Sequence, residues 1–194
     1  MNSFTSQHNS AHTPRRIPMP KIIENLRSTL IEEAKYQVNK FGYAGMTIKS
    51  VSKACNIGVG TVYNYFKSKE ELVFAFMYEE WLEALAVMRK CSEETDSPEV
   101  LFRCIHSEIG NYTKEHQRLI TDKNAAKVFS VHYFSGHEFL RVQIEDIIAP
   151  VCMPLAKNPS PLLCSFMAEM LLIWSATGAD FDEIYAVLKD HFKE

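Results

Sequence analysis

Residues 47–72 read TIKSVSKACNIGVGTVYNYFKSKEEL and contain two short segments whose apolar residues recur at helical spacing. Thr47 is a favourable N-cap for the first segment. Asn56 and Gly58 then indicate a tight turn, and residues 59–66 form the second segment. Two short helices joined by a tight turn are the helix-turn-helix arrangement, so the sequence predicts that motif here.

Longer helices are predicted on both sides of this motif. Between residues 21 and 41, apolar residues recur every three or four positions, which indicates an amphipathic helix, and Gly42 follows where a left-handed C-cap is favourable. Downstream, Ser68 and Glu71 have the spacing of a capping box, and the helix that they begin is expected to extend to about Lys90. The motif is therefore expected to lie between two long helices.

The rest of the chain also has helical periodicity, and no segment alternates convincingly as a strand would. After a break at residues 95–98, four or five helices are predicted at residues 98–115, 121–134, 137–155, 160–177 and 180–192. Their ends are marked by Gly136, Pro150, Pro154, Pro159, Pro161 and Gly178. The predicted fold is all-α. It consists of a flexible tail (1–20), a three-helix helix-turn-helix domain (21–67) and a helical C-terminal domain (68–194).

The composition excludes several classes of protein. Hydrophobic residues make up 46% of the 194 residues and charged residues 23%, which is close to globular usage and excludes wholesale disorder or a collagen-like chain. No uninterrupted apolar stretch reaches about 18 residues, so no membrane span is expected. The first twenty residues lack the apolar core of a signal peptide.

The cysteines favour a reducing compartment. The chain has five, an odd number, and none forms a C-x-x-C pair, so neither a disulfide framework nor a zinc finger is indicated. A cytoplasmic protein with buried, inert thiols at Cys91, Cys104, Cys152 and Cys164 is expected, with oxidant sensing as the alternative.

Charge is distributed unevenly along the chain. Residues 1–72 contain ten Lys or Arg against five Asp or Glu, whereas residues 73–194 contain eleven against nineteen. Residues 34–69 contain six lysines and no acidic residue. Such segregation favours contact between the N-terminal part and a polyanion, although a solvated basic face is the plain alternative.

In a helix-turn-helix motif the second short helix lies in the major groove of DNA with its N-terminal residues at the base edges. Here Gly58, Val59, Gly60 and Thr61 occupy those leading positions. Lys69 stands at a helix N-terminus, where a bound phosphate would offset the unfavourable charge. The complete set of predicted DNA-binding residues is Thr47, Lys49, Gly58, Val59, Gly60, Thr61, Tyr63, Asn64, Tyr65, Lys67 and Lys69.

These residues resemble the DNA-binding domain of TetR-type transcriptional regulators. The run GTVYNYFKSKEEL, residues 60–72, is highly specific to that family, and the resemblance covers about residues 22–75. It implies that Thr47 and Lys69 bind backbone phosphates and that Tyr63 and Tyr65 contact phosphate or sugar. It also implies that Gly60 allows close approach to the duplex and that Thr61 lies at or near base edges.

The sequence departs from the family pattern at two positions of this helix. Val59 replaces a polar residue that many members have, so hydrogen-bonded readout is lost there while contact with a thymine methyl group is retained. Gly58 replaces a Ser or Thr N-cap, which weakens the helix by a few tenths of a kcal/mol at most. The operator sequence is therefore not readable from these residues.

The last two predicted helices are rich in apolar residues. Residues 160–177 are apolar on nearly every face, so this helix must be buried on all sides, either in a dimer or in the core of a single chain. The resemblance implies a homodimer held by a four-helix bundle. The predicted dimer-interface residues are Leu163, Phe166, Met167, Met170, Leu171, Trp174, Phe181, Ile184, Tyr185 and Leu188.

The middle helices would hold an effector pocket if the family logic applies. Aromatic and methionine side chains suit an apolar or aromatic small molecule, although such residues also form ordinary cores. The candidate lining residues are Trp81, Phe102, His106, Tyr112, Phe129, His132, Tyr133, Phe134, Met153 and Met167. No histidine pair has the spacing typical of helical metal ligands, so neither a metal site nor a cofactor is expected.

Taken together, the sequence predicts a dimeric, ligand-responsive transcriptional regulator that binds a palindromic DNA operator. A repressor released by its effector is favoured over an activator, and catalysis is not expected. Two alternatives stay open. One is a DNA-bound module without an effector that recruits another protein, and the other is an enzyme or metal protein with an attached DNA-binding module.

Overall fold

The computed structural model describes residues 25–193, with the backbone alone for residue 124 and residues 126–136. The predicted tail, residues 1–20, lies outside the described residues. The described chain is helical and contains no β-strand, which confirms the all-α prediction. The helices are α1 (Leu26–Gly45), α2 (Ile48–Ala54), α3 (Val59–Tyr65), α4 (Lys69–Glu94), α5 (Pro98–Glu115), α6 (Gln117–Thr121), α7 (Lys123–Leu155), α8 (Pro161–Thr177) and α9 (Phe181–Leu188), followed by a 3-10 turn at Lys189–His191.

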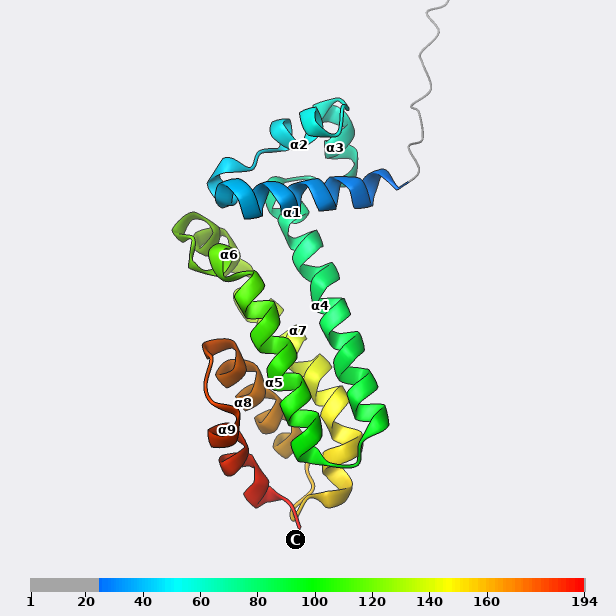
Figure 1. Cartoon of the computed structure of the whole chain (residues 1–194), viewed down its shortest axis with the longest axis vertical. Coiled ribbons are helices and arrows are strands. Elements are labelled where there is room, and N and C mark those ends of the chain that lie inside the picture. The colour runs from blue at the N-terminus through cyan, green and yellow to red at the C-terminus, as the bar shows by residue number, and fades with distance from the viewer. Residues whose placement is uncertain (1–24, 194) are drawn as a thin grey trace, which may run out of the picture.

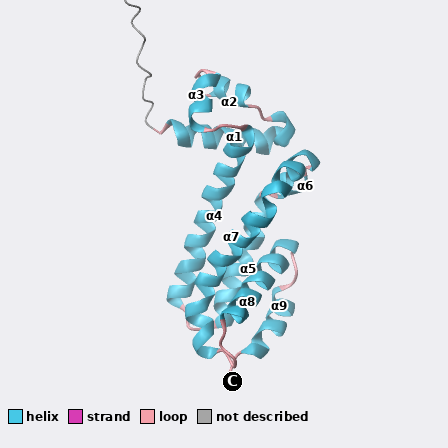
Figure 2. Cartoon of the chain, turned by 180° about the vertical axis from the view of Figure 1, so that it is seen from behind, coloured by secondary structure: helices cyan, strands magenta, loops and turns pink. Residues whose placement is uncertain are grey.

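Helix α1 crosses one end of the molecule, with α2 and α3 on its outer side and the other helices on its inner side (Figure 1). Helices α4, α5 and α7 run lengthwise away from α1, and α8 and α9 pack beside them in the half remote from α1 (Figures 1 and 2). The helix-turn-helix unit is therefore mounted on α1 and faces away from the body of the protein.

Local signals in the sequence position the first four helices as predicted. Gly42 has a positive φ of 75°, which interrupts α1 before its last short turn. Thr47 caps α2, and Ser68 caps α4 by accepting a hydrogen bond from the Glu71 N–H. Glu71 accepts from the Lys67 N–H and not from that of Ser68, so only half of the predicted capping box forms.

The middle of the chain differs from the prediction. Residues 123–155 form one helix of 33 residues, so the prediction of separate helices at 121–134 and 137–155 is wrong. Gly136, Pro150 and Pro154 all lie inside it. A helical Gly costs only about 1 kcal/mol, and burial of apolar residues around Pro150 opposes the larger cost of the proline. Helix α6, five residues long, was not predicted.

Two apolar cores fill the molecule. One joins α1, α2 and α3 to the start of α4, where Leu72, Val73 and Phe76 are buried, and reaches Leu119 of α6. The other lies among α4, α5, α7, α8 and α9. Since the first core extends beyond residue 67, the division of the chain at that residue stays a prediction.

Cys91 of α4 and Cys104 of α5 form a disulfide, so the prediction that both are free thiols is wrong. The two helices pack against each other, and the Cα atoms of the cysteines lie 6.7 Å apart, within the reach of a disulfide. Cys55, Cys152 and Cys164 are free. Among the described residues, no helix is both long enough and apolar enough to span a membrane.

Candidate nucleic-acid interface

Helix α2 is fixed at its N-terminus by reciprocal hydrogen bonds. The Ser50 N–H donates to Thr47 Oγ1, and the Thr47 N–H donates to Ser50 Oγ, each at 3.0 Å. Ser50 Oγ also lies 2.5 Å from Oε1 of Gln37 on α1. Gln37 is only 5% exposed, so this contact satisfies a buried amide and ties α2 to α1.

The turn between α2 and α3 uses Asn56 in the left-handed region, at φ 53°, where asparagine is one of the better tolerated residues. The Ile57 N–H donates to the Ser52 carbonyl, which closes the turn. Gly58 is the N-cap of α3 with an ordinary φ of −73°, and its carbonyl accepts from the Thr61 N–H at 2.9 Å. The backbone conformation at position 58 therefore does not require a glycine.

Helix α3 has a small, mostly exposed surface on the side that faces away from the rest of the protein. Val62 is fully buried and Phe66, just after the helix, is 2% exposed, so these two side chains fix the helix to the core. On the opposite side Tyr63 is 46% exposed. The predicted DNA-binding residues that are exposed are Thr47, Lys49, Gly58, Val59, Gly60, Tyr63, Asn64, Tyr65 and Lys67, whereas Thr61 is half-buried.

The lysines of this region differ in their surroundings. Lys49 and Lys67 are exposed and neither forms an ion pair with another described residue, although Lys67 Nζ donates to the Tyr63 carbonyl at 3.4 Å. Lys69 is half-buried, and its Nζ donates to the Tyr43 carbonyl and lies 3.8 Å from the centre of the Tyr43 ring. Burial lowers the pKa of Lys69. Its ammonium group therefore already has a partner within the chain.

Tyr43 and Gln37 support the interface from behind, and neither was predicted as a functional residue. The Tyr43 hydroxyl donates to Glu70 Oε1 at 2.7 Å, which joins the end of α1 to the start of α4. Burial and this hydrogen bond raise the pKa of Tyr43, and the same bond lowers the pKa of Glu70. Gln37 could have been found in the sequence as a polar residue on the apolar side of α1, three positions after Ala34.

The described members of the predicted effector-pocket set lie in the second core or beside it. Trp81 and Tyr112 meet edge to face with ring centres 5.4 Å apart, and Trp81 Nε1 donates to Gln143 Oε1 at 2.7 Å. His106 Nδ1 lies 3.0 Å from Ser175 Oγ, and burial lowers the pKa of this histidine. Phe102 and Met167 are buried in the same core, and Met153 packs against it. The side chains of Phe129, His132, Tyr133 and Phe134 lie outside the described residues.

Two hollows among the described residues lie elsewhere. One, of about 440 Å³, is lined by α8 residues such as Leu162 and Phe166 together with Asp190 and His191. The other, of about 460 Å³, lies where α1, α4 and the α5–α6 corner meet, and Glu80 and His116 line it. Neither hollow is lined by a predicted effector-pocket residue, so that set stays a prediction.

The predicted dimer residues divide by burial within the single chain. Met167, Leu171, Phe181, Ile184 and Leu188 are buried in the chain's own core and have little or no surface to offer a partner. Leu163, Phe166, Met170, Trp174 and Tyr185 are partly exposed. Leu162, which was not predicted, is 80% exposed, and Ile173 of α8 and Val187 of α9 are also exposed.

No group of three or more His, Cys, Asp or Glu side chains within the described part of the chain is placed to hold a metal ion. The sites that the described residues do form are the exposed face of α3 with its basic surroundings and the apolar surface of α8 and α9. A three-helix unit that presents such a helix is a helix-turn-helix module of the DNA-binding type.

The comparisons with known proteins agree with this class. Residues 30–76 match the family model described as bacterial regulatory proteins, tetR family. An HTH-type transcriptional regulator of Bacillus subtilis (strain 168), YhgD, is 41% identical over 46 residues, which are 24% of this chain and 24% of that protein. The sequence match thus spans about a quarter of the curated relative.

Solved structures of low sequence identity share the fold over most of the chain. A TetR-family transcriptional regulator from Pectobacterium atrosepticum aligns with a TM-score of 0.59 at 18% identity, over 85% of this chain and 89% of that chain. The TetR family repressor AlkX from Dietzia sp. strain DQ12-45-1b aligns with a TM-score of 0.57 at 13% identity, over 85% of this chain and 98% of that chain. Residues 30–76 are thus similar in sequence to the tetR family of bacterial regulatory proteins, and the chain shares the fold of these solved structures.

Proposed function

We propose that this protein is a dimeric transcriptional repressor of the cytoplasm that binds a palindromic DNA operator and is released by a small-molecule effector. The observation that carries the proposal is α3, whose Val62 side is buried while its outer side exposes Val59, Gly60 and Tyr63. A short helix held in this way fits the major groove, with its leading residues at the base edges.

The phosphate contacts are assigned to groups on both sides of α3. The exposed Lys49 and Lys67 supply charge, and Thr47, Tyr63 and Tyr65 supply hydroxyl groups. Lys69 is better explained as a positioning residue, because its ammonium group holds the Tyr43 carbonyl. A phosphate would recruit Lys69 only by replacing that contact.

The test is binding to a genomic DNA fragment from the region upstream of the protein's own gene, measured at several salt concentrations. We expect specific binding whose affinity falls steeply with salt, because each lysine on a phosphate releases counterions. Tyr63→Ala with Lys49→Ala should weaken binding by about 10-fold or more, since charged and hydroxyl contacts each contribute about 1 kcal/mol.

Tyr78→Ala is the matched control. Tyr78 lies on α4 outside the proposed interface and is 47% exposed, almost the same fraction as Tyr63. It should leave DNA affinity unchanged. Equal weakening by both substitutions, or binding of the Tyr63 and Lys49 variant as tight as that of the wild type, would show that the DNA surface lies elsewhere.

The proposed dimer uses the outer surface of α8 and α9. Leu162, Phe166 and Ile173 follow each other at helical spacing on α8 and are all exposed in the single chain. Exposed apolar surface of this kind marks a protein contact. Phe166→Glu should convert dimers to monomers in sedimentation experiments, whereas Leu82→Glu, at an exposed position on α4, should not.

One observation favours a second candidate function, a DNA-bound module without an effector. Trp81 and Tyr112 pack edge to face within the second core, and Trp81 Nε1 donates to Gln143, so these side chains already have partners in the chain, as in a DNA-bound module without an effector. Thermal-shift screening with apolar and aromatic compounds, followed by DNA binding, distinguishes the two. A compound that stabilises the protein and weakens operator binding supports the effector, and binding without change in DNA affinity contradicts it.

A further inference from the structure

The Cys91–Cys104 disulfide lies at the closed end of the α4–α5 hairpin. Cys91 is in the last turn of α4, Cys104 is in the second turn of α5, and only residues 95–97 connect the two helices. Both cysteines are half-buried, and Cys91 packs against the second core. A small reagent can therefore reach the pair without unfolding of the protein.

The two helices of the hairpin run side by side toward the helix-turn-helix unit (Figure 1), and there Tyr112 of α5 donates from its hydroxyl group to the Met77 carbonyl of α4 at 3.3 Å. Helix α4 begins at Lys69, three residues after Phe66 fixes the end of α3. Helix α5 ends at the corner before α6, and both α4 and α6 contact α1. The end of the hairpin remote from the disulfide thus contacts α1 of the helix-turn-helix unit through both α4 and α6.

We propose that Cys91 and Cys104 are a reversible oxidation site, which peroxides convert to the disulfide and cellular thiols reduce, and that its state changes DNA affinity. This inference rests on the proposed function. A protein that works on DNA in a reducing cytoplasm keeps a disulfide only transiently, so a disulfide there is a redox-sensing or catalytic feature.

The chemistry is balanced with hydrogen peroxide as the oxidant. One thiolate attacks a peroxide oxygen, which gives a sulfenic acid and, after proton transfer, one water. The second thiol attacks the sulfenic sulfur and displaces a second water as the disulfide forms. The two sulfur atoms together lose two electrons, and peroxide gains them. A dithiol reductant returns both thiols and becomes a cyclic disulfide.

The other cysteines are poorly suited to this reaction. Burial raises the pKa of Cys152 to about 12 and also raises the pKa of Cys164 and Cys55, so the reactive thiolate is rare at each. None of these three is paired. Oxidation is therefore expected to be selective for Cys91 and Cys104.

The first test counts thiols in the full-length protein. After dithiothreitol, a maleimide reagent should label all five cysteines under denaturing conditions, and after mild peroxide it should label the three free ones. The intact mass should fall by two hydrogen atoms. The oxidised form should also melt several degrees higher, because the cross-link restricts the unfolded chain. Five labelled thiols after peroxide, or labelling that no longer recovers after dithiothreitol, would overturn the proposal.

The second test measures operator affinity of the same two forms. We expect a difference of at least threefold in the wild type and in Cys164→Ala, and no difference in Cys104→Ser, which cannot form the disulfide. A disulfide that forms reversibly without changing DNA affinity would overturn the regulatory role. Absence of DNA binding in both forms, with normal thiol counts, would instead overturn the proposed function while the oxidation site stands.

Discussion

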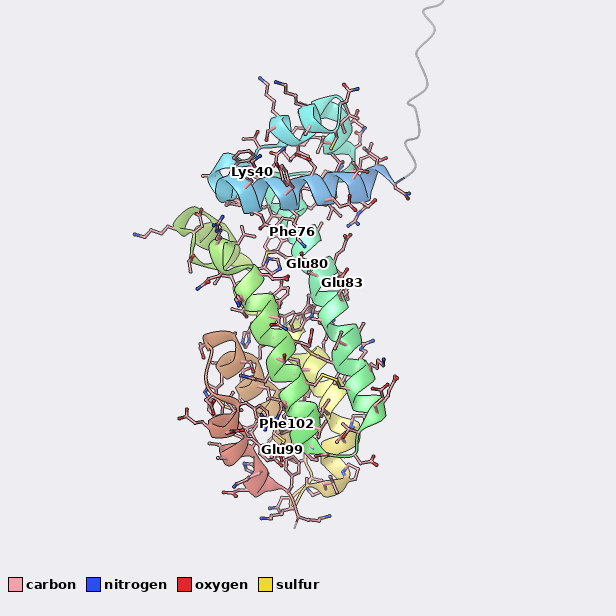
Figure 3. All side chains as sticks on the ribbon, viewed as in Figure 1. Lys40, Phe76, Glu80, Glu83, Glu99 and Phe102 are labelled. Carbon is pink, nitrogen blue, oxygen red and sulfur yellow. A yellow bond between two sulfur atoms is a disulfide. The ribbon has the colours of Figure 1, made fainter. Side chains whose placement is uncertain are left out.

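His116 Nε2 lies 2.7 Å from Oε2 of Glu80, and the two side chains are only 4% and 12% exposed. The other oxygen of the same carboxylate pairs with Lys35 Nζ of α1. Since Glu80 belongs to α4 and His116 to the corner between α5 and α6, this cluster joins three parts of the fold. Figure 3 shows Glu80 on the part of α4 that lies below α1, one turn from Phe76.

Removal of the shared carboxylate should be costly. Glu80→Ala leaves the buried His116 and the Lys35 ammonium without their partner, so we expect a loss of about 2–4 kcal/mol in the free energy of unfolding. Urea denaturation followed by circular dichroism measures it. Glu79→Ala is the matched control, because Glu79 forms an exposed ion pair with Arg27 and its loss should cost less than about 1 kcal/mol. Similar losses of unfolding free energy in Glu80→Ala and Glu79→Ala would contradict the expectation that the Glu80 cluster stabilises the fold more than an exposed ion pair does.

Stability should fall as the solution becomes mildly acidic. Burial lowers the pKa of His116 below its ordinary value of 6.5, and this outweighs the opposing effect of Glu80. As the pH falls below about 6.5, the unfolded chain therefore takes up a proton at His116 before the folded protein does, which favours unfolding.

The measurement is the free energy of unfolding at about pH 7.5 and about pH 5.5, on either side of the ordinary histidine pKa. His116→Gln keeps an N–H donor but cannot titrate, so its loss between the two conditions should be smaller than that of the wild type. His106 also has a lowered pKa and contributes to the remaining loss in both proteins. Equal losses of unfolding free energy between the two pH values in the wild type and in the variant would show that His116 does not set the pH dependence.

Gly42 lies at the break inside α1, near the end of that helix. Its φ of 75° is a conformation that side chains rarely adopt, although no heavy atom lies within 4 Å of the place that a Cβ atom would occupy. Gly42→Ala should therefore destabilise the protein by about 1–2 kcal/mol through backbone strain alone. Thermal denaturation measures the change. Gly110→Ala on α5, where space is also open but φ is ordinary, should be neutral or slightly stabilising, and an equal loss there would contradict the explanation.

The sequence was sufficient where structure is set by neighbouring residues. Thr47, Ser68 and Gly42 act within a few positions of themselves, so the start of α2, the start of α4 and the break in α1 were predicted correctly. The exposed side of α3 followed from the same local pattern, and most predicted DNA-binding residues lie on the surface there. Whether they bind DNA stays a prediction.

The sequence was insufficient where packing overrides local preference or joins distant positions. Pro150 weakens a helix locally, yet Ile148 and Cys152 beside it are buried and keep α7 continuous. Glu80 and His116 each look like ordinary polar residues, and only the fold brings them together. The same holds for Cys91 and Cys104, whose spacing of 13 residues indicates a disulfide only when α4 and α5 are known to form a hairpin.

The substitution Gly60→Ala is expected to affect protein stability and DNA binding in opposite directions. Gly60 lies in the first turn of α3, it is exposed, and no heavy atom of the protein lies within 4 Å of a Cβ added there. Gly60→Ala should keep or raise the free energy of unfolding, by up to about 1 kcal/mol, because alanine is the better helix former. If the backbone of α3 approaches the duplex closely at this point, the added methyl group contacts DNA, and operator affinity should fall by about 10-fold.

Thermal melting and DNA titration of the same sample give both the free energy of unfolding and the operator affinity. Val59→Ala, at the preceding exposed position, removes side-chain atoms and should not produce that steric loss. Unchanged affinity for Gly60→Ala would mean that the N-terminal turn of α3 does not lie against the duplex.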